Sequence, residues 1–135
     1  MRRIILCLMI VSAVALHADA PEYKKALALC RRIYLNVRYI RSETVIKSPL
    51  DTFIYGGDCA DMSALMVYLM ESEGMHAEIV LLDLLGYESH HALVLYAGMW
   101  FDPTVGKMYT PHHFPFWHIV MDTVENHELL AGWRR

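Results

Sequence analysis

Residues 56–74, GGDCADMSALMVYLMESEG, place a cysteine directly after two glycines and at the start of a helical pattern. With Asp58 as the N-cap, Cys59 occupies the first helical turn, where unpaired backbone N–H groups and the helix dipole stabilise a thiolate. The glycines leave the approach to the sulfur free of side chains. The same N–H groups could bind a carbonyl oxygen as it gains negative charge. Cys59 is therefore a candidate nucleophile for acyl transfer.

A nucleophilic cysteine needs a histidine base and a third group that orients the imidazole, and residues 88–104, ESHHALVLYAGMWFDPT, contain both. If Ala97-Gly98 forms a two-residue hairpin turn, His91 and Asp102 are diagonal neighbours on one face of the hairpin. His90 then points the opposite way. A longer turn would shift the register by one residue and move the carboxylate to the wrong face.

The elements that position these side chains follow from the hydrophobic pattern. Apolar residues at helical spacing predict helices over 23–39 and 58–73, with a loop over 42–57 between them. The first helix carries Cys30 on its apolar side, where it is expected in the core. The second helix is apolar nearly all round, which places it at the centre of the fold.

Beyond Gly74 the hydrophobic period becomes that of strands. Helices followed by consecutive strands predict an α+β fold with an antiparallel sheet. The tail carries a short strand pattern and then a short helical pattern. The predicted elements after Gly74 are strands over 77–84, 92–96, 99–101 and 118–121 and a helix over 124–130.

The N-terminal residues have the pattern of a secretory signal peptide. Two arginines precede an apolar run over 4–16, and Ala18-Asp19-Ala20 fits a cleavage site, so residues 1–20 are the predicted signal. The run of about 13 residues is shorter than the roughly 20 that cross a bilayer, which favours cleavage over an uncleaved membrane anchor. Residues 21–135 then form a single domain, exported to the periplasm or secreted.

The charge distribution excludes one class of partner. The formal net charge is -3, with both signs mixed along the chain. No basic stripe is present, so nucleic acid is not an expected partner.

These residues resemble the transglutaminase-like superfamily of cysteine enzymes, which includes the bacterial transglutaminase-like cysteine proteinases and shares a papain-like fold. The resemblance is carried by YGGDCADMSALMVYLMESEGMHAEIV and HHALVLYAGMWFDPT and, more weakly, by NVRYIRSE. It spans about residues 25–110. It implies a papain-like core in which an N-terminal helix and a central cysteine-bearing helix pack on an antiparallel sheet.

The resemblance also implies roles for individual residues. Cys59 would be the nucleophile. His91, which is the histidine followed by alanine, would be the general base and acid. Asp102 would orient the imidazole. The backbone N–H of Cys59 and the side chain of Tyr55 are the candidates for the oxyanion hole. Asp61 matches a recurring acidic position, which fits a helix-end charge equally well.

The implied chemistry is attack of the thiolate on an amide carbonyl, followed by a thioester that water or an amine resolves. It needs no cofactor. The accessible substrates of an exported enzyme are peptides and proteins, cell-wall peptides included. The pattern leaves the oligomeric state open.

Two alternatives remain at this point. Cys7 lies in the predicted signal peptide, so Cys30 and Cys59 could form a disulfide in an oxidising compartment and leave an inert structural or binding domain. The histidine pairs at 90–91 and 112–113, with His118, could form a metal site. Adjacent histidines in a strand point to opposite faces, which makes each pair a poor chelate.

Overall fold

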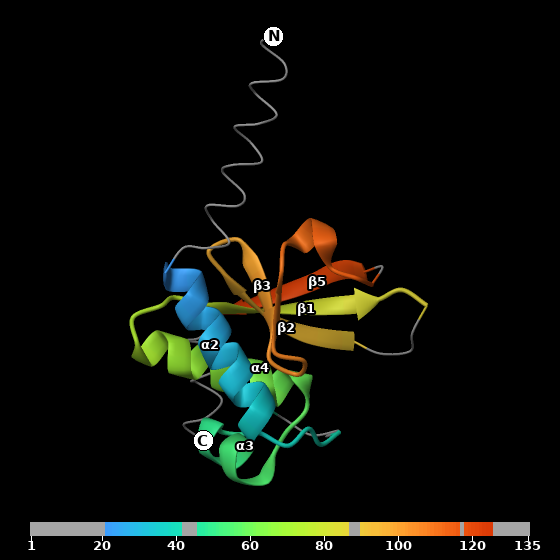
Figure 1. The fold of residues 1–135 in the computed structure, drawn as a ribbon. Coiled ribbons are helices and arrows are strands. Elements are labelled where there is room, and N and C mark those ends of the chain that lie inside the picture. Colours follow the sequence, from blue (N-terminus) through green and yellow to red (C-terminus); the bar gives the residue numbers. More distant parts are fainter. Residues whose placement is uncertain (1–20, 42–45, 87–89, 117, 126–135) are drawn as a thin grey trace.

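The computed structural model describes residues 21–41, 46–86, 90–116 and 118–125. Three α-helices come first, and a sheet with one short 3-10 helix follows (Figure 1). The elements are α2 (Pro21–Asn36), α3 (Pro49–Tyr55), α4 (Cys59–Ser72), β1 (Glu78–Leu84), β2 (His90–Tyr96), β3 (Met99–Asp102), β4 (Lys107–Tyr109), η1 (Pro111–His113) and β5 (His118–Glu125).

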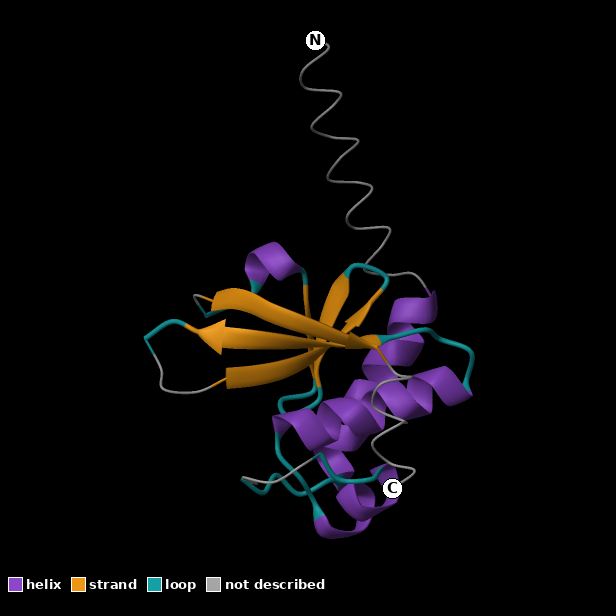
Figure 2. Ribbon diagram, turned by 180° about the vertical axis from the view of Figure 1, so that it is seen from behind, coloured by secondary structure: helices purple, strands orange, loops and turns teal. Residues whose placement is uncertain are grey.

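The five strands form one antiparallel sheet in the order β4-β3-β2-β1-β5. The α-helices lie on one side of this sheet and η1 on the other, as Figure 2 shows from behind. After β4 the chain passes through η1 to the far edge, where β5 pairs with β1. The predicted α+β class, with helices packed on an antiparallel sheet, is confirmed.

Helix α4 is the centre of the core, as its apolar pattern predicts. Residues 61–67 and Met70 are buried, and they pack with α2 and with one face of the sheet. The hydroxyl of Ser63 donates a hydrogen bond of 3.2 Å to the carbonyl of Ala92 in β2. This bond satisfies a buried polar group and fixes α4 along β2, because an unpaired buried hydroxyl would cost free energy.

The hairpin between β2 and β3 has the predicted register. Ala97 and Gly98 both have positive φ, at 47° and 80°, as a type I′ turn requires. Leu95 pairs with Trp100, Val94 with Phe101 and Tyr96 with Met99. The two-residue turn and the register that it sets are confirmed.

Two other expectations are corrected. The predicted loop over 42–57 contains helix α3, which begins where Ser48 accepts a hydrogen bond of 3.2 Å from the N–H of Asp51. Ser-Pro reads as a break, but it is also a good helix start, since proline fits the first turn and serine caps it. The helix predicted over 124–130 is wrong at its first two residues, which lie in β5, and its remainder is outside the described residues.

The strand predicted over 118–121 is present and extends to Glu125. The predicted signal peptide, residues 1–20, lies outside the described residues. Within the described ranges, no helix has both the length and the hydropathy to cross a membrane.

Candidate active site

His91 and Asp102 meet at the β2–β3 hairpin. Nε2 of His91 lies 2.8 Å from Oδ2 of Asp102, and both side chains are largely buried, with 19% and 7% of their surface exposed. His91 is the second residue of β2 and Asp102 the last of β3. The contact that the hairpin register predicts is therefore present.

The other oxygen of Asp102 is held by Thr104. Oδ1 accepts hydrogen bonds from the N–H of Thr104 at 3.0 Å and from its hydroxyl at 2.6 Å. The Asp102 carbonyl accepts a further bond from the N–H of Gly106, 2.8 Å away, which closes the turn after β3. The carboxylate is thus fixed with one oxygen toward His91. The motif Asp-Pro-Thr was visible in the sequence, but the positioning contact of Thr104 was not anticipated.

The electrostatics of His91 depend on its two neighbours. Burial lowers the pKa of His91, but interactions with Asp102 and Cys59 outweigh it and raise the pKa from its ordinary 6.5 to about 9. The imidazole is therefore a cation at neutral pH, held by the Asp102 carboxylate.

Cys59 is the first residue of α4, with Asp58 as its N-cap, as predicted. The N–H of Asp61 donates to Oδ1 of Asp58 at 3.0 Å, and the N–H of Met62 donates to the Asp58 carbonyl. Among the described residues, no acceptor meets the N–H of Cys59. That N–H is available to an oxyanion that forms beside the sulfur.

Asp61 is a structural carboxylate at the start of α4. It is 2% exposed, and its Oδ2 accepts the N–H of Asp58 at 3.1 Å, which completes a capping box. Its Oδ1 accepts the N–H of Lys47 at 2.7 Å. These contacts favour the interpretation of Asp61 as a helix-end charge. Asp61 also binds the backbone of Lys47, which is distant in sequence.

The two glycines before the cysteine are required by close packing. A Cβ on Gly57 would lie 2.4 Å from Cβ of Asp61, and one on Gly56 would lie 2.3 Å from the carbonyl oxygen of Arg38. Gly56 also has a φ of 86°, which favours glycine. Both residues are buried, so their role is backbone packing rather than the open approach to the sulfur that the sequence suggested.

The cysteines do not form the disulfide considered as an alternative, because Cys30 and Cys59 are both free. Cys30 is fully buried, as predicted, and its thiol lies 3.8 Å from the carbonyl oxygen of Lys107. Burial, with a further contribution from Asp102, raises the pKa of Cys30 to about 12. This thiol stays protonated and unreactive at neutral pH.

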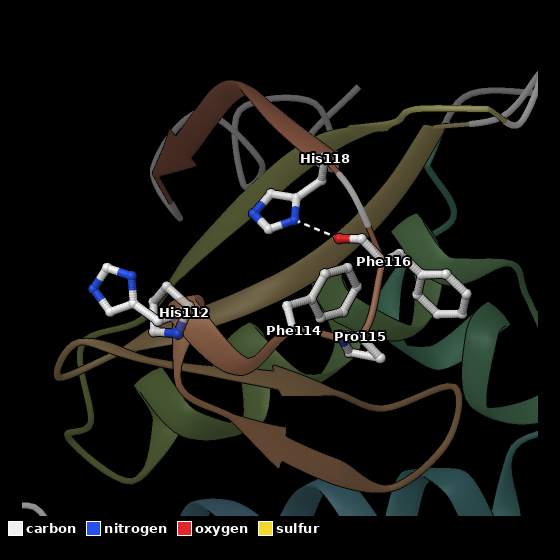
Figure 3. A pocket seen from close by; sticks show the side chains of 6 residues that line it. His112, Phe114, Pro115, Phe116 and His118 are labelled. Carbon is white, nitrogen blue, oxygen red and sulfur yellow. Dashed lines mark hydrogen bonds between the residues drawn. The ribbon is translucent and has the colours of Figure 1, made fainter.

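The remaining candidate residues lie elsewhere. Tyr55 is the last residue of α3 and is 64% exposed. His90 is exposed and lies 3.8 Å from Asp83. His112 and His118 line a hollow of about 580 Å³ beside Phe114 on the η1 side of the sheet (Figure 3). In the part of the chain that the structure describes, no group of three His, Cys, Asp or Glu side chains could hold a metal ion.

Known structures share this fold. Legionella pneumophila LapG matches with a TM-score of 0.66 and 14% identity, over 86% of this chain and 76% of LapG. Its calcium-bound form matches with a TM-score of 0.62 and 15% identity, over 81% of this chain and 71% of that one. At such identities the likeness shows the fold, which is the expected papain-like one.

A further match is a protein of Cytophaga hutchinsonii that has been assigned as a cysteine protease, with a TM-score of 0.58 and 27% identity. The match covers 75% of this chain and 36% of that one, so this chain corresponds to about a third of that protein. No protein-family model and no curated protein matches the chain. The comparisons therefore support a cysteine peptidase-like fold.

The raised pKa of His91 predicts a pH-dependent stability. A group whose pKa is higher in the folded state stabilises the fold fully below its unfolded pKa of 6.5 and loses this effect as pH rises through about 9. The free energy of unfolding should fall by up to about 3 kcal/mol over that window, at roughly 1.4 kcal/mol per pKa unit. Urea unfolding of the native protein and of His91→Gln at several pH values measures this free energy. If it changed with pH in the same way in both proteins, the prediction would be contradicted.

Thr104 offers a test of how the carboxylate is held. Thr104→Val keeps the shape of the side chain but removes the hydroxyl donor to Asp102, which should cost about 1 to 3 kcal/mol because the bond is to a charged group. Thr104→Ser keeps the donor and is the matched control. Thermal unfolding of the two variants should separate them, and equal losses would show that the hydroxyl does not hold the carboxylate.

Gly57→Ala tests the packing of the helix start. The added methyl group meets Asp61 and should destabilise the fold by about 1 to 3 kcal/mol, as overpacking does. Gly74→Ala is the control, since its Cβ meets no atom within 4 Å and its cost comes from a positive φ alone. Iodoacetamide labelling of Cys59 should slow in Gly57→Ala and stay unchanged in Gly74→Ala, and the opposite pattern would refute this account.

Proposed function

We propose that this chain is an exported cysteine-dependent enzyme that transfers acyl groups from amide bonds of peptides or proteins. The observation that carries the proposal is the pairing of His91 with Asp102, with 2.8 Å between Nε2 and Oδ2, together with a cysteine at a helix start that is among the groups raising the pKa of the imidazole. A thiolate beside a cationic imidazole is the resting form of an activated cysteine nucleophile.

In the proposed reaction the Cys59 thiolate attacks the carbonyl carbon of the amide, and a C–S bond forms as the carbonyl oxygen takes the negative charge. The N–H of Cys59 donates to that oxygen. The intermediate collapses when His91 gives its proton to the leaving nitrogen, which departs as an amine and leaves a thioester on the sulfur.

The thioester is resolved by a second nucleophile. Neutral His91 now accepts a proton from water or from an amine, which attacks the same carbonyl carbon. The C–S bond breaks, and the thiolate and the imidazolium are restored together with a carboxylic acid or a new amide. Asp102 keeps the imidazole oriented in both half-reactions and does not itself exchange a proton.

The likeness to a protein assigned as a cysteine protease supports this chemistry. The signal-like residues 1–20 support an exported enzyme, which would meet peptides, cell-wall peptides and proteins outside the cytoplasm. The proposed steps need neither a metal ion nor an organic cofactor.

Thiol labelling tests the proposal without a known substrate. Cys59 should react with iodoacetamide at a rate that stays high below about pH 8.5, the range in which an ordinary thiol becomes protonated. Cys30 is the internal control, because it is buried and its pKa is about 12. His91→Gln should slow the labelling of Cys59 at pH 7 by at least about tenfold. The proposal would be refuted if the labelling rate of Cys59 had the pH dependence of an ordinary thiol and were the same in His91→Gln as in the native protein.

A further inference from the structure

Tyr39 is held beside the start of α4 by a short backbone pairing. The N–H of Ile40 donates to the carbonyl of Gly57 at 2.9 Å, and the N–H of Gly57 donates to the carbonyl of Arg38 at 3.1 Å. These two bonds form an isolated parallel bridge between Tyr39 and Gly57. The bridge fixes the backbone of Tyr39 two residues from the candidate nucleophile.

The bridge brings Tyr39 beside the first turn of α4. Its partner Gly57 packs so closely against that turn that a Cβ there would lie 2.4 Å from Cβ of Asp61. Cys59 is the first residue of the same turn.

Electrostatic contacts of the phenol agree with this placement. Burial raises the pKa of Tyr39, and the negative charge of Cys59 is the next largest contribution, followed by that of Asp58. Arg41 opposes the effect, and Asp102 adds a smaller increase. The charges of Cys59 and Asp58 thus act on the phenol, and its raised pKa keeps the hydroxyl protonated at neutral pH.

We propose that the hydroxyl of Tyr39 is the side-chain donor of the oxyanion hole and acts together with the backbone N–H of Cys59. This inference rests on the proposed function, since an oxyanion forms only if Cys59 attacks a carbonyl. Tyr55, which the sequence suggested, is the competing candidate and lies at the exposed end of α3.

The role needs a neutral donor and space for a substrate. The protonated phenol donates a hydrogen bond to the oxygen of the tetrahedral intermediate and loses no proton in the step. Tyr39 is 55% exposed, so a substrate can reach its side chain from solvent. A phenylalanine at this position would keep the ring and remove the donor alone.

The test compares two reagents that react with the same sulfur. Iodoacetamide alkylates a thiolate at a saturated carbon and forms no oxyanion, whereas p-nitrophenyl acetate acylates it through a tetrahedral oxyanion. Tyr39→Phe should slow acylation of Cys59 by p-nitrophenyl acetate at least about tenfold, in the range seen when one oxyanion donor is removed. Alkylation by iodoacetamide should stay within about twofold of the native rate.

Two tyrosine variants complete the design. Tyr68→Phe is the matched control, because Tyr68 lies about 13 Å further along α4, and both of its rates should equal those of the native protein. Tyr55→Phe should also leave the ratio of the two rates unchanged. A selective loss of acylation in Tyr55→Phe, with none in Tyr39→Phe, would overturn the inference in favour of Tyr55.

The remaining outcomes are equally decisive. If Tyr39→Phe slows both reactions equally, Tyr39 supports the thiolate or the fold and not the oxyanion. If Tyr39→Phe slows neither reaction, the hydroxyl of Tyr39 is not part of the oxyanion hole. Either result overturns the inference and leaves the proposed function standing. A native protein whose Cys59 shows no enhanced reactivity toward iodoacetamide would instead overturn the proposed function.

Discussion

The start of α4 is held in place by two carboxylates that each accept a backbone N–H from the other's residue. Asp58 caps Asp61, and Asp61 caps Asp58 while it also binds the N–H of Lys47. Gly57 fits against this capping box because it has no side chain. Two segments of the chain therefore meet at one helix end through backbone groups, and this geometry fixes the backbone that carries Cys59, whose side chain packs against the core.

The second half of the site is built on one hairpin. The turn at Ala97-Gly98 sets the register, and the register brings His91 opposite the end of β3, where the turn after Asp102 fixes the carboxylate through Thr104. The pair thus depends on local backbone geometry. The bond from Ser63 to the carbonyl of Ala92 links this hairpin to α4 and so joins the two halves.

The features that could be predicted from the sequence are the local ones. Helix α4 has a long apolar pattern, the β2–β3 turn has residues that accept a positive φ, and the register of His91 and Asp102 follows from that turn. Together they predicted the fold class and the contact between His91 and Asp102.

Contacts between distant segments could not be predicted in this way. The partner of Asp61 is Lys47, and the partner of Gly57 is Tyr39, and no short-range pattern connects either pair. Val124 lies in β5 because it pairs with Ile79 of β1, which overrides the helical pattern of the tail. Helix α3 was missed for a different reason, since a serine followed by proline can mark a break or a helix start.

The burial of Cys30 has a consequence for redox chemistry. A peroxide that reaches the partly buried Cys59 would oxidise its sulfur to a sulfenic acid. Repair within a protein needs a second, reactive thiol, and Cys30 is fully buried, protonated and bonded to the Lys107 carbonyl. Among the described residues, Cys30 is therefore not a resolving cysteine for Cys59.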